Sequence, residues 1–224
     1  MADTRAHAGE LAREAIARGD VTGWFDTLYR ESERDGFRIS WVDLAPNPYL
    51  VDWLAAHASA EHASAARGRA LVVGCGYGDD AELLAQRGFD VLAFDVSPAA
   101  VARCHSRFPG SAVEYAVADV LTPPAEWAGA FDFVFEAYTV QVLPGAARRA
   151  CARSIAATVA PGGILLAVAR SRREEDAEGL MPWPLTRAEL DEFRAPGLAL
   201  AKLLEVVEPG DPPVPRFVAE FRRA

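Results

Sequence analysis

The sequence is poor in cysteine, has no long apolar run and carries no excess of positive charge. Its three cysteines are isolated and form no CxxC pair, so they predict neither a disulfide framework nor a metal site. No apolar stretch approaches the roughly 20 residues that cross a bilayer. Charged side chains interrupt the first twenty residues, which therefore lack the apolar core of a signal peptide. We expect a cytoplasmic protein without a membrane partner.

The charge balance is acidic, with 32 Asp and Glu against 23 Lys and Arg and a formal net charge of −9. Such a surface repels phosphate backbones, so nucleic acid is not an expected partner. The chain of 224 residues is 51% hydrophobic and 25% charged, which is typical of one globular domain with a full core. The oligomeric state stays open between a monomer and a homodimer.

The front of the chain, residues 1–68, predicts helices. The ranges 4–18 and 20–35 have helical patterns, and the second places apolar side chains on one face. A third helix is expected to begin at Asn47, an N-cap residue, with Pro48 in its first turn. We expect this helical segment to cover the substrate.

From Arg69 onward, residues 69–224, apolar strands alternate with short helical patterns. The expected strands are 70–73, 90–94, 112–117, 131–135 and 164–169, with a closing pair at 199–208 and 214–223. Between them we expect a helix over 145–159 and helices that begin at the N-cap residues Ser97 and Thr186. Strands that alternate with helices indicate βαβ units and a parallel sheet covered on both faces. The predicted fold class is α/β, a single doubly wound, mostly parallel, seven-stranded sheet with an N-terminal helical lid.

Residues 69–97, RALVVGCGYGDDAELLAQRGFDVLAFDVS, suggest a ligand site. Gly74, Gly76 and Gly78 follow an apolar strand, where glycine permits a sharp turn and lets a ligand touch bare backbone. The helix behind them offers free N–H groups. Asp95 ends the next strand at about the distance, roughly 20 residues, at which a ribose-binding acid is expected. The first inference is a ligand that contains a nucleoside.

Two classes of ligand compete for this loop. Gly76, Gly78 and Ala81 satisfy the GxGxx[G/A] dinucleotide fingerprint, so an NAD-dependent oxidoreductase is one alternative. Asp79 and Asp80 argue against it, because two carboxylates at the start of the helix would repel a pyrophosphate. A cationic nucleoside without phosphate, such as S-adenosylmethionine, suits the acids better.

Further motifs follow in order: Asp119 in VADV, Glu136 at the end of FDFVFE, and VAPGGILLAVA. With the glycine loop and Asp95, this set resembles the class I S-adenosylmethionine-dependent methyltransferase fold over roughly residues 69–170. The resemblance implies a glycine loop on the methionine part, Asp95 on the ribose and Asp119 on the adenine. The residues that it places on the cofactor are Trp41, Gly74, Cys75, Gly76, Gly78, Asp95, Val96, Asp119, Val120 and Glu136.

Within that class the chain resembles the thiopurine methyltransferase-like branch, which includes small-thiol and halide methyltransferases. The similar pieces are GWFDTLYRE and SWVDLAPNPYLVDWL in the front segment, the GCGYGDD loop, and MPWPLTRAEL late in the chain. In that branch the front segment closes over the cofactor. Many class I members carry an acid two residues before the first glycine, whereas this chain has Val72, so the partner of the methionine amine stays open.

The expected activity is methyl transfer from S-adenosylmethionine to a small molecule, with S-adenosylhomocysteine as product. No well-placed general base is evident, which favours a thiol acceptor, since a thiol supplies some thiolate unaided. O- or N-methylation and non-catalytic binding of S-adenosylmethionine remain alternatives. We expect Glu136 and Tyr138 to be catalytic. The expected substrate-binding residues are Trp24, Tyr29, Tyr138, Gln141, Met181 and Trp183.

Overall fold

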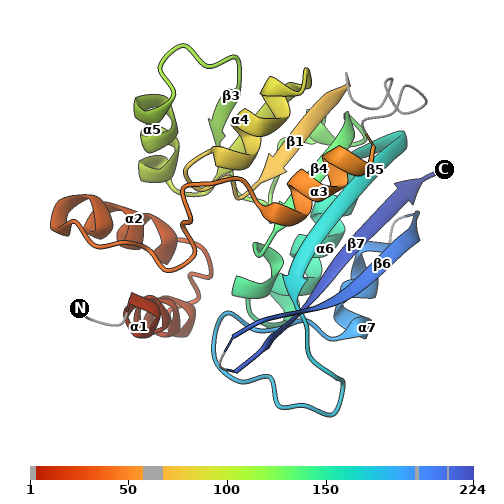
Figure 1. Ribbon diagram of the computed structural model, residues 1–224. Coiled ribbons are helices and arrows are strands. Elements are labelled where there is room, and N and C mark those ends of the chain that lie inside the picture. Colours follow the sequence, from red (N-terminus) through yellow and green to blue (C-terminus); the bar gives the residue numbers. More distant parts are fainter. Residues whose placement is uncertain (1–3, 58–67, 195–196, 211) are drawn as a thin grey trace.

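The computed structural model describes residues 4–57, 68–194, 197–210 and 212–224. Seven strands form one sheet in the order β3-β2-β1-β4-β5-β7-β6 (Figure 1). Strands β1 to β5 are parallel to one another, and β7 runs antiparallel to both β5 and β6. The bounds are β1 Arg69–Val73, β2 Asp90–Asp95, β3 Glu114–Val117, β4 Phe131–Ala137, β5 Val159–Arg170, β6 Leu198–Glu208 and β7 Val214–Arg223. The predicted mostly parallel seven-stranded sheet is confirmed.

Helices cover both faces of this sheet (Figure 1). One face carries α3 (Pro48–Ala56), α4 (Asp79–Gln86) and α5 (Pro98–Arg107), and the other carries α6 (Gly145–Thr158) and α7 (Arg187–Leu190). Local sequence sets their starts, since the side chains of Asn47, Ser97 and Thr186 each accept a backbone N–H in the first turn of α3, α5 and α7 respectively. No helix in the described ranges is long and apolar enough to cross a membrane.

The alternation of side chains along β1 divides the core into two layers. Leu71 and Val73 pack with Ile155 of α6, whereas Val72 packs on the opposite face with Leu50 of α3 and Leu84 of α4. All are nearly inaccessible to water. A strand that is apolar on both faces is typical of the centre of a parallel sheet covered by helices.

The front helices α1 (Thr4–Ala17) and α2 (Trp24–Asp35) form a third apolar cluster, which reaches α5 through Ala100. Asp26 of α2 fixes this contact, because its carboxylate accepts hydrogen bonds from Ser97 Oγ at 2.8 Å and from the Ala99 N–H at 3.0 Å. The Asp26 carboxylate lies at the N-terminus of α5, where the helix dipole favours a negative charge. The front segment is thus packed onto the sheet domain. The expected division at residues 68 and 69 stays a prediction, since residues 58–67 lie outside the described residues.

Two elements differ from their expected bounds. The helix expected over 145–159 ends at Thr158, and β5 already begins at Val159, before Pro161, because its first residue pairs with Phe131 of β4. The helix expected after Thr186 has a single α turn, Arg187–Leu190, and continues as a 3₁₀ turn over Asp191–Arg194. Both differences concern the ends of elements and leave their order intact.

Candidate functional site

A cavity of about 600 Å³ opens at the carboxyl ends of the parallel strands. This is the edge where open α/β sheets bind ligands, and the volume lies within the usual range for small-molecule sites. Of the predicted site residues, the cavity is lined by Tyr29, Trp41, Gly74, Cys75, Gly76, Asp95, Val96, Asp119, Val120, Tyr138, Gln141 and Met181. Segments distant in sequence therefore meet in one place, with the front segment as part of the wall.

The three loop glycines have different roles. All adopt a positive φ, at 60°, 54° and 90° for Gly74, Gly76 and Gly78, a region that favours glycine. Gly74 and Gly76 line the cavity with Cys75 between them. Gly78 is not part of the lining: a Cβ there would lie 2.5 Å from Tyr115 Oη. The expected cofactor contact of Gly78 is thus not supported, because that glycine makes room for Tyr115.

Asp95 is only 5% exposed, yet it reaches the cavity wall. One carboxylate oxygen accepts the Gly76 N–H at 3.0 Å, and the other accepts the Ser97 N–H at 2.9 Å. Burial raises the pKa of Asp95 to about 6, and these backbone donors oppose the increase. The carboxylate is therefore mostly ionised at neutral pH and can accept a further hydrogen bond from a ligand hydroxyl.

Asp119 and Val120 line the cavity beyond β3. One oxygen of Asp119 accepts the Leu121 N–H at 2.8 Å, and the other accepts the hydroxyl of Thr22 at 3.4 Å. Thr22 directly precedes α2 and lines the same cavity. The front segment thus contacts the predicted adenine end of the site.

The paired acids after the glycine loop are separated by their partners. Asp79 forms two hydrogen bonds with the Arg107 guanidinium, at 2.7 and 2.8 Å. Both acids line the cavity; Asp80 accepts the Asn47 N–H at 2.6 Å, and burial raises its pKa to about 6. Neither acid was predicted to be a site residue, although both directly follow the glycine loop.

Glu136 was expected to contact the cofactor or the substrate, but it lies outside the cavity lining. It is fully buried. Its Oε1 accepts the N–H groups of Thr139 and Val140 at 2.8 and 3.1 Å, while Oε2 has no hydrogen-bond partner among the described residues. Burial raises the pKa of Glu136 to about 7. The expected direct contact with cofactor or substrate is therefore not supported, because the carboxylate holds the turn that follows β4.

That turn presents Tyr138 and Gln141 to the cavity. Tyr138 has a φ of +66°, which is uncommon for a bulky residue and typical of functional sites. The Oε1 of Gln141 accepts the Arg170 N–H at 2.7 Å, and its backbone oxygen accepts the Trp183 N–H at 2.7 Å. Gln141 thus joins the turn to β5 and to the loop that precedes α7.

Aromatic residues of the front segment form part of the wall. Tyr29 and Trp41 both line the cavity, and Trp41 Nε1 donates to Tyr29 Oη at 3.4 Å. Trp24 does not line it: it is 2% exposed and stacks on Phe25 with ring centroids 3.8 Å apart. The expected substrate contact of Trp24 is therefore not supported, because the ring belongs to the core between α1, α2 and α5.

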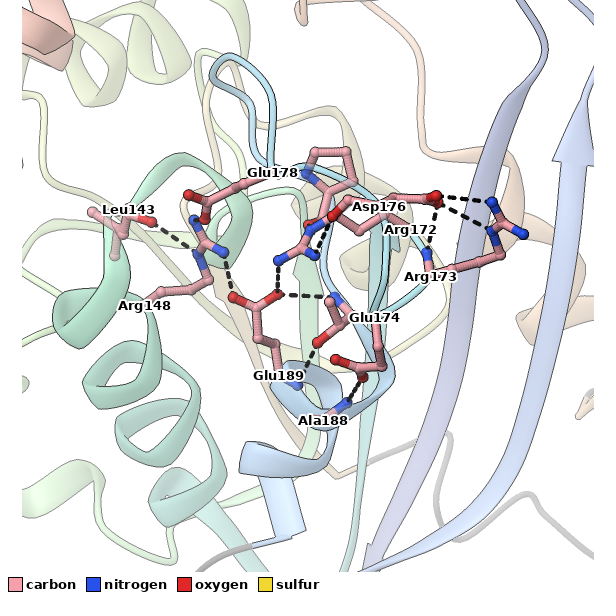
Figure 2. Close-up of polar contacts among 11 residues, drawn as sticks. Leu143, Arg148, Arg172, Arg173, Glu174, Asp176, Glu178, Ala188 and Glu189 are labelled. Atoms are coloured by element: carbon pink, nitrogen blue, oxygen red, sulfur yellow. Dashed lines mark hydrogen bonds and ion pairs between the residues drawn. The ribbon is translucent and has the colours of Figure 1, made fainter.

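The loop from Ser171 to Thr186 is fastened by arginines, as Figure 2 shows. Arg148 of α6, 2% exposed, donates to the Leu143 carbonyl at 3.0 Å and pairs with Glu178 and Glu189. Arg172 donates to Glu189 from the other side at 3.3 Å. This network holds the loop that places Met181 on the cavity wall.

Trp183 belongs to the same loop but lies outside the cavity lining. The carbon of the Arg148 guanidinium lies 5.4 Å from the centre of the Trp183 ring, within cation–π range. The expected substrate contact of Trp183 is not supported, because this ring covers the ion network instead. Arg170, Arg216 and Glu208 line the cavity without having been predicted.

Comparison with known proteins agrees with this geometry. Residues 70–163 match the family model described as a methyltransferase domain. A ubiquinone biosynthesis O-methyltransferase of Pseudomonas aeruginosa (strain UCBPP-PA14) is 36% identical over 121 residues, 52% of this chain and 48% of that protein. The chain spans about half the length of the curated relatives that it matches first.

Solved structures share the fold. A chain from work on the conversion of a disulfide bond into a thioacetal group during echinomycin biosynthesis has a TM-score of 0.72 and 24% identity, and covers 90% of this chain and 91% of its own. The N-methyltransferase NodS of Bradyrhizobium japonicum WM9, in complex with S-adenosyl-L-homocysteine, has a TM-score of 0.66 and 21% identity, with 87% and 97% covered.

Fold, site and family model define one class. Residues 70–163 match a methyltransferase-domain model, and the fold, the cavity and the named relatives agree with the class I S-adenosylmethionine-dependent methyltransferases, whose cofactor is S-adenosylmethionine. The predictions of this domain class and of this cofactor are thereby confirmed. The resemblance to the thiopurine methyltransferase-like branch and the preference for a thiol stay predictions. So do the cytoplasmic location and the choice between monomer and homodimer.

Proposed function

We propose that this protein transfers a methyl group from S-adenosylmethionine to a small-molecule acceptor. The main support is that a glycine loop, a buried aspartate at the position expected for a ribose-binding acid, and several aromatic residues line one cavity. When bound, S-adenosylmethionine supplies a methyl group on a sulfonium sulfur. The nucleophile of the acceptor bonds to the methyl carbon as the carbon–sulfur bond breaks, and the sulfur leaves as the neutral thioether of S-adenosylhomocysteine. The task of the protein is to hold the two reactants in line.

The residues present fit this cofactor. Gly74 and Gly76 offer a backbone surface free of side chains, and Asp95 offers an ionised carboxylate to the ribose hydroxyls. Asp119 with Val120 forms the adenine end. Asp80 supplies a negative charge near the loop, which suits a ligand with an ammonium group and a sulfonium. Asp80 thus takes the place of the acid that the sequence lacks at Val72.

The acceptor would lie between the front segment and the turn after β4, against Tyr29, Trp41, Tyr138 and Met181. Tyr138 and Gln141 contact it directly in this proposal, and Glu136 positions their turn. The contribution of Tyr29 and Trp41 supports a front segment that covers the site, as in the thiopurine methyltransferase-like branch.

A thiol remains the favoured acceptor. The carboxylates of the cavity wall already accept hydrogen bonds from backbone or side-chain donors, and burial raises the pKa of Tyr29 well above its usual value, so neither group is a ready base. An acceptor that ionises near neutral pH needs no base. The structural neighbour associated with disulfide conversion also concerns sulfur chemistry. O- and N-methylation are the second candidates, because relatives carry those names.

The first experiment is calorimetric titration with S-adenosylmethionine, S-adenosylhomocysteine and NAD. We expect both adenosyl ligands to bind and NAD not to bind. Matched thiol, hydroxyl and amine acceptors then follow, with formation of S-adenosylhomocysteine as readout. Turnover of oxygen or nitrogen acceptors alone would refute the thiol preference. Binding without any transfer would indicate a non-catalytic binder, and binding of NAD alone would refute the proposal.

A further inference from the structure

Three arginines line the cavity, Arg5 from α1 and the pair Arg170 and Arg216 from the sheet, and methyl transfer as proposed does not use the pair. Arg170 ends β5, and Arg216 is its direct partner in the antiparallel pairing of β5 with β7. Side chains at directly paired positions project from the same face of a sheet. Two like charges side by side are unfavourable, so each arginine of the pair needs an opposite charge nearby.

Arg216 is compensated within the protein. Its guanidinium pairs with Glu208 of β6, and its central carbon lies 5.0 Å from the centre of the Tyr138 ring. Tyr49 Oη also donates to Glu208, at 2.7 Å. Together these contacts leave Arg216 as a fixed part of the wall, with its positive charge neutralised.

Arg170 is not compensated in this way. Its backbone N–H is held by Gln141, but among the described residues its guanidinium has no hydrogen-bond or ion-pair partner. Burial lowers the pKa of Arg170, the nearby charges of Arg5 and Arg216 lower it further, and Tyr138 and Glu208 oppose the decrease. A partly buried cation that makes no direct ion pair is unfavourable. A ligand with a negative group would relieve it.

We propose that Arg170 binds a carboxylate of the methyl acceptor, so that the substrate is a small monocarboxylic acid. The planar guanidinium fork matches a carboxylate with two parallel hydrogen bonds. A single negative charge suits the site, because Arg216 is already paired with Glu208 and the carboxylate of Asp80 on the same wall would repel a dianion. This inference rests on the proposed methyl transfer.

A carboxylate could also come from the methionine part of the cofactor. The position of Arg170 favours the acceptor. In the sheet, β5 is separated from β1 by β4, which places the end of β5 about 10 Å from the end of β1 at the usual strand spacing. The glycine loop follows β1, whereas the predicted ribose and adenine residues follow β2 and β3 on the far side. Arg170 thus lies on the opposite side of the loop from the nucleoside end.

The test compares acids with their neutral esters. The probes are 4-mercapto-, 4-hydroxy- and 4-aminobenzoate and the methyl ester of each. Affinity is measured by calorimetry with and without S-adenosylhomocysteine, and methylation is measured with S-adenosylmethionine. Arg170→Gln is compared with wild type and with Arg149→Gln, a control that removes the same charge from an exposed position on α6.

We expect at least one wild-type acid to bind about 10- to 100-fold more tightly than its ester, the usual effect of a charge-assisted hydrogen bond. Arg170→Gln should abolish this preference and Arg149→Gln should keep it, with the affinity for S-adenosylmethionine unchanged in both. Equal affinity for acids and esters in wild type, or failure of every acid to bind, would overturn the inference. A tenfold loss of S-adenosylmethionine affinity in Arg170→Gln would assign the arginine to the cofactor and also overturn it. A preference for acids without any methyl transfer would refute the proposed function while retaining the carboxylate site.

Discussion

Asp95, at the end of β2, accepts a hydrogen bond from the backbone N–H of Gly76 at 3.0 Å. This contact links the acid of one strand to the glycine loop of its neighbour, so both are held in fixed relation before any ligand arrives. Because the site is already ordered, less conformational entropy is lost when a ligand binds. The hydrogen bond fixes the loop and the acid relative to each other.

Asp95→Asn removes the negative charge and nearly preserves the shape of the side chain. We expect the affinity for S-adenosylmethionine to fall about tenfold or more, because hydrogen bonds to a charged acceptor contribute about 1.5–3 kcal/mol. Calorimetric titration measures this affinity. Asp90→Asn, at the exposed start of the same strand, is the matched control and should bind as wild type does. Equal affinities in both variants would show that Asp95 does not hold the ribose.

Glu136 should make stability depend on pH. Its pKa is about 7 in the folded protein against the ordinary value of 4.5, so between these values the folded state keeps a proton that the unfolded state has lost. The stabilisation is complete below about pH 4.5, and it is lost as pH rises through 7. The free energy of unfolding of wild type minus that of Glu136→Gln should therefore fall across this window, by at most about 3 kcal/mol.

Urea denaturation at several pH values measures this difference. Subtracting the Glu136→Gln curve removes the contributions of Asp80 and Asp95, which also have raised pKa values. Glu126→Gln, at an exposed position, serves as control and should follow the wild-type curve. A difference curve that is flat from pH 4.5 to 7 would contradict the assignment.

Arg148→Met should loosen the loop between Ser171 and Thr186. The substitution removes the buried donor of the Leu143 carbonyl and one of the two arginines that pair with Glu189, which keeps Arg172. The loss should therefore not exceed the about 3–5 kcal/mol of a broken buried pair. We expect a corresponding loss in the free energy of unfolding and a higher KM for the acceptor through Met181, with unchanged affinity for S-adenosylmethionine. Arg149→Met is the adjacent exposed control and should change stability by less than about 0.5 kcal/mol. Comparable losses in both variants would argue against the network.

Gly78→Ala should affect stability rather than direct cofactor contact. The new Cβ would collide with Tyr115 Oη, and φ is +90°, so we expect a loss of about 2–3 kcal/mol from strain and overpacking. Adding Tyr115→Phe removes the closest atom, and the two effects should be less than additive. Gly129→Ala, with φ +63° and open space around it, isolates the backbone strain. Strict additivity of the double variant would contradict the collision.

The sequence predicted those parts of the fold that depend on neighbours along the chain. Asn47, Ser97 and Thr186 each begin a helix as expected, because an N-cap and its helix are separated by only a few residues. The glycine loop and Asp95 were found together for the same reason, since one βαβ unit contains both.

The errors concern residues whose surroundings come from distant segments. Trp24 and Trp183 are aromatic residues of the expected pocket segments, but tertiary packing directs one into the front core and the other onto Arg148. Glu136 was placed at a strand end correctly, but its orientation follows from the turn that folds back over it. Residue type and position do not determine which way such a side chain points.

The sequence alone determined the alternation of strands and helices, the cofactor loop and the acid that follows it, because these depend on local propensity and hydrophobic period. Tertiary structure alone decided the charge of the cavity wall that we propose for the acceptor. Arg170 and Arg216 are 46 positions apart in the sequence numbering, and they become neighbours only when β7 inserts beside β5. Asp80 reaches the cavity beside Asn47 for the same reason. Long-range pairing sets the charge of that wall, and no local pattern encodes it.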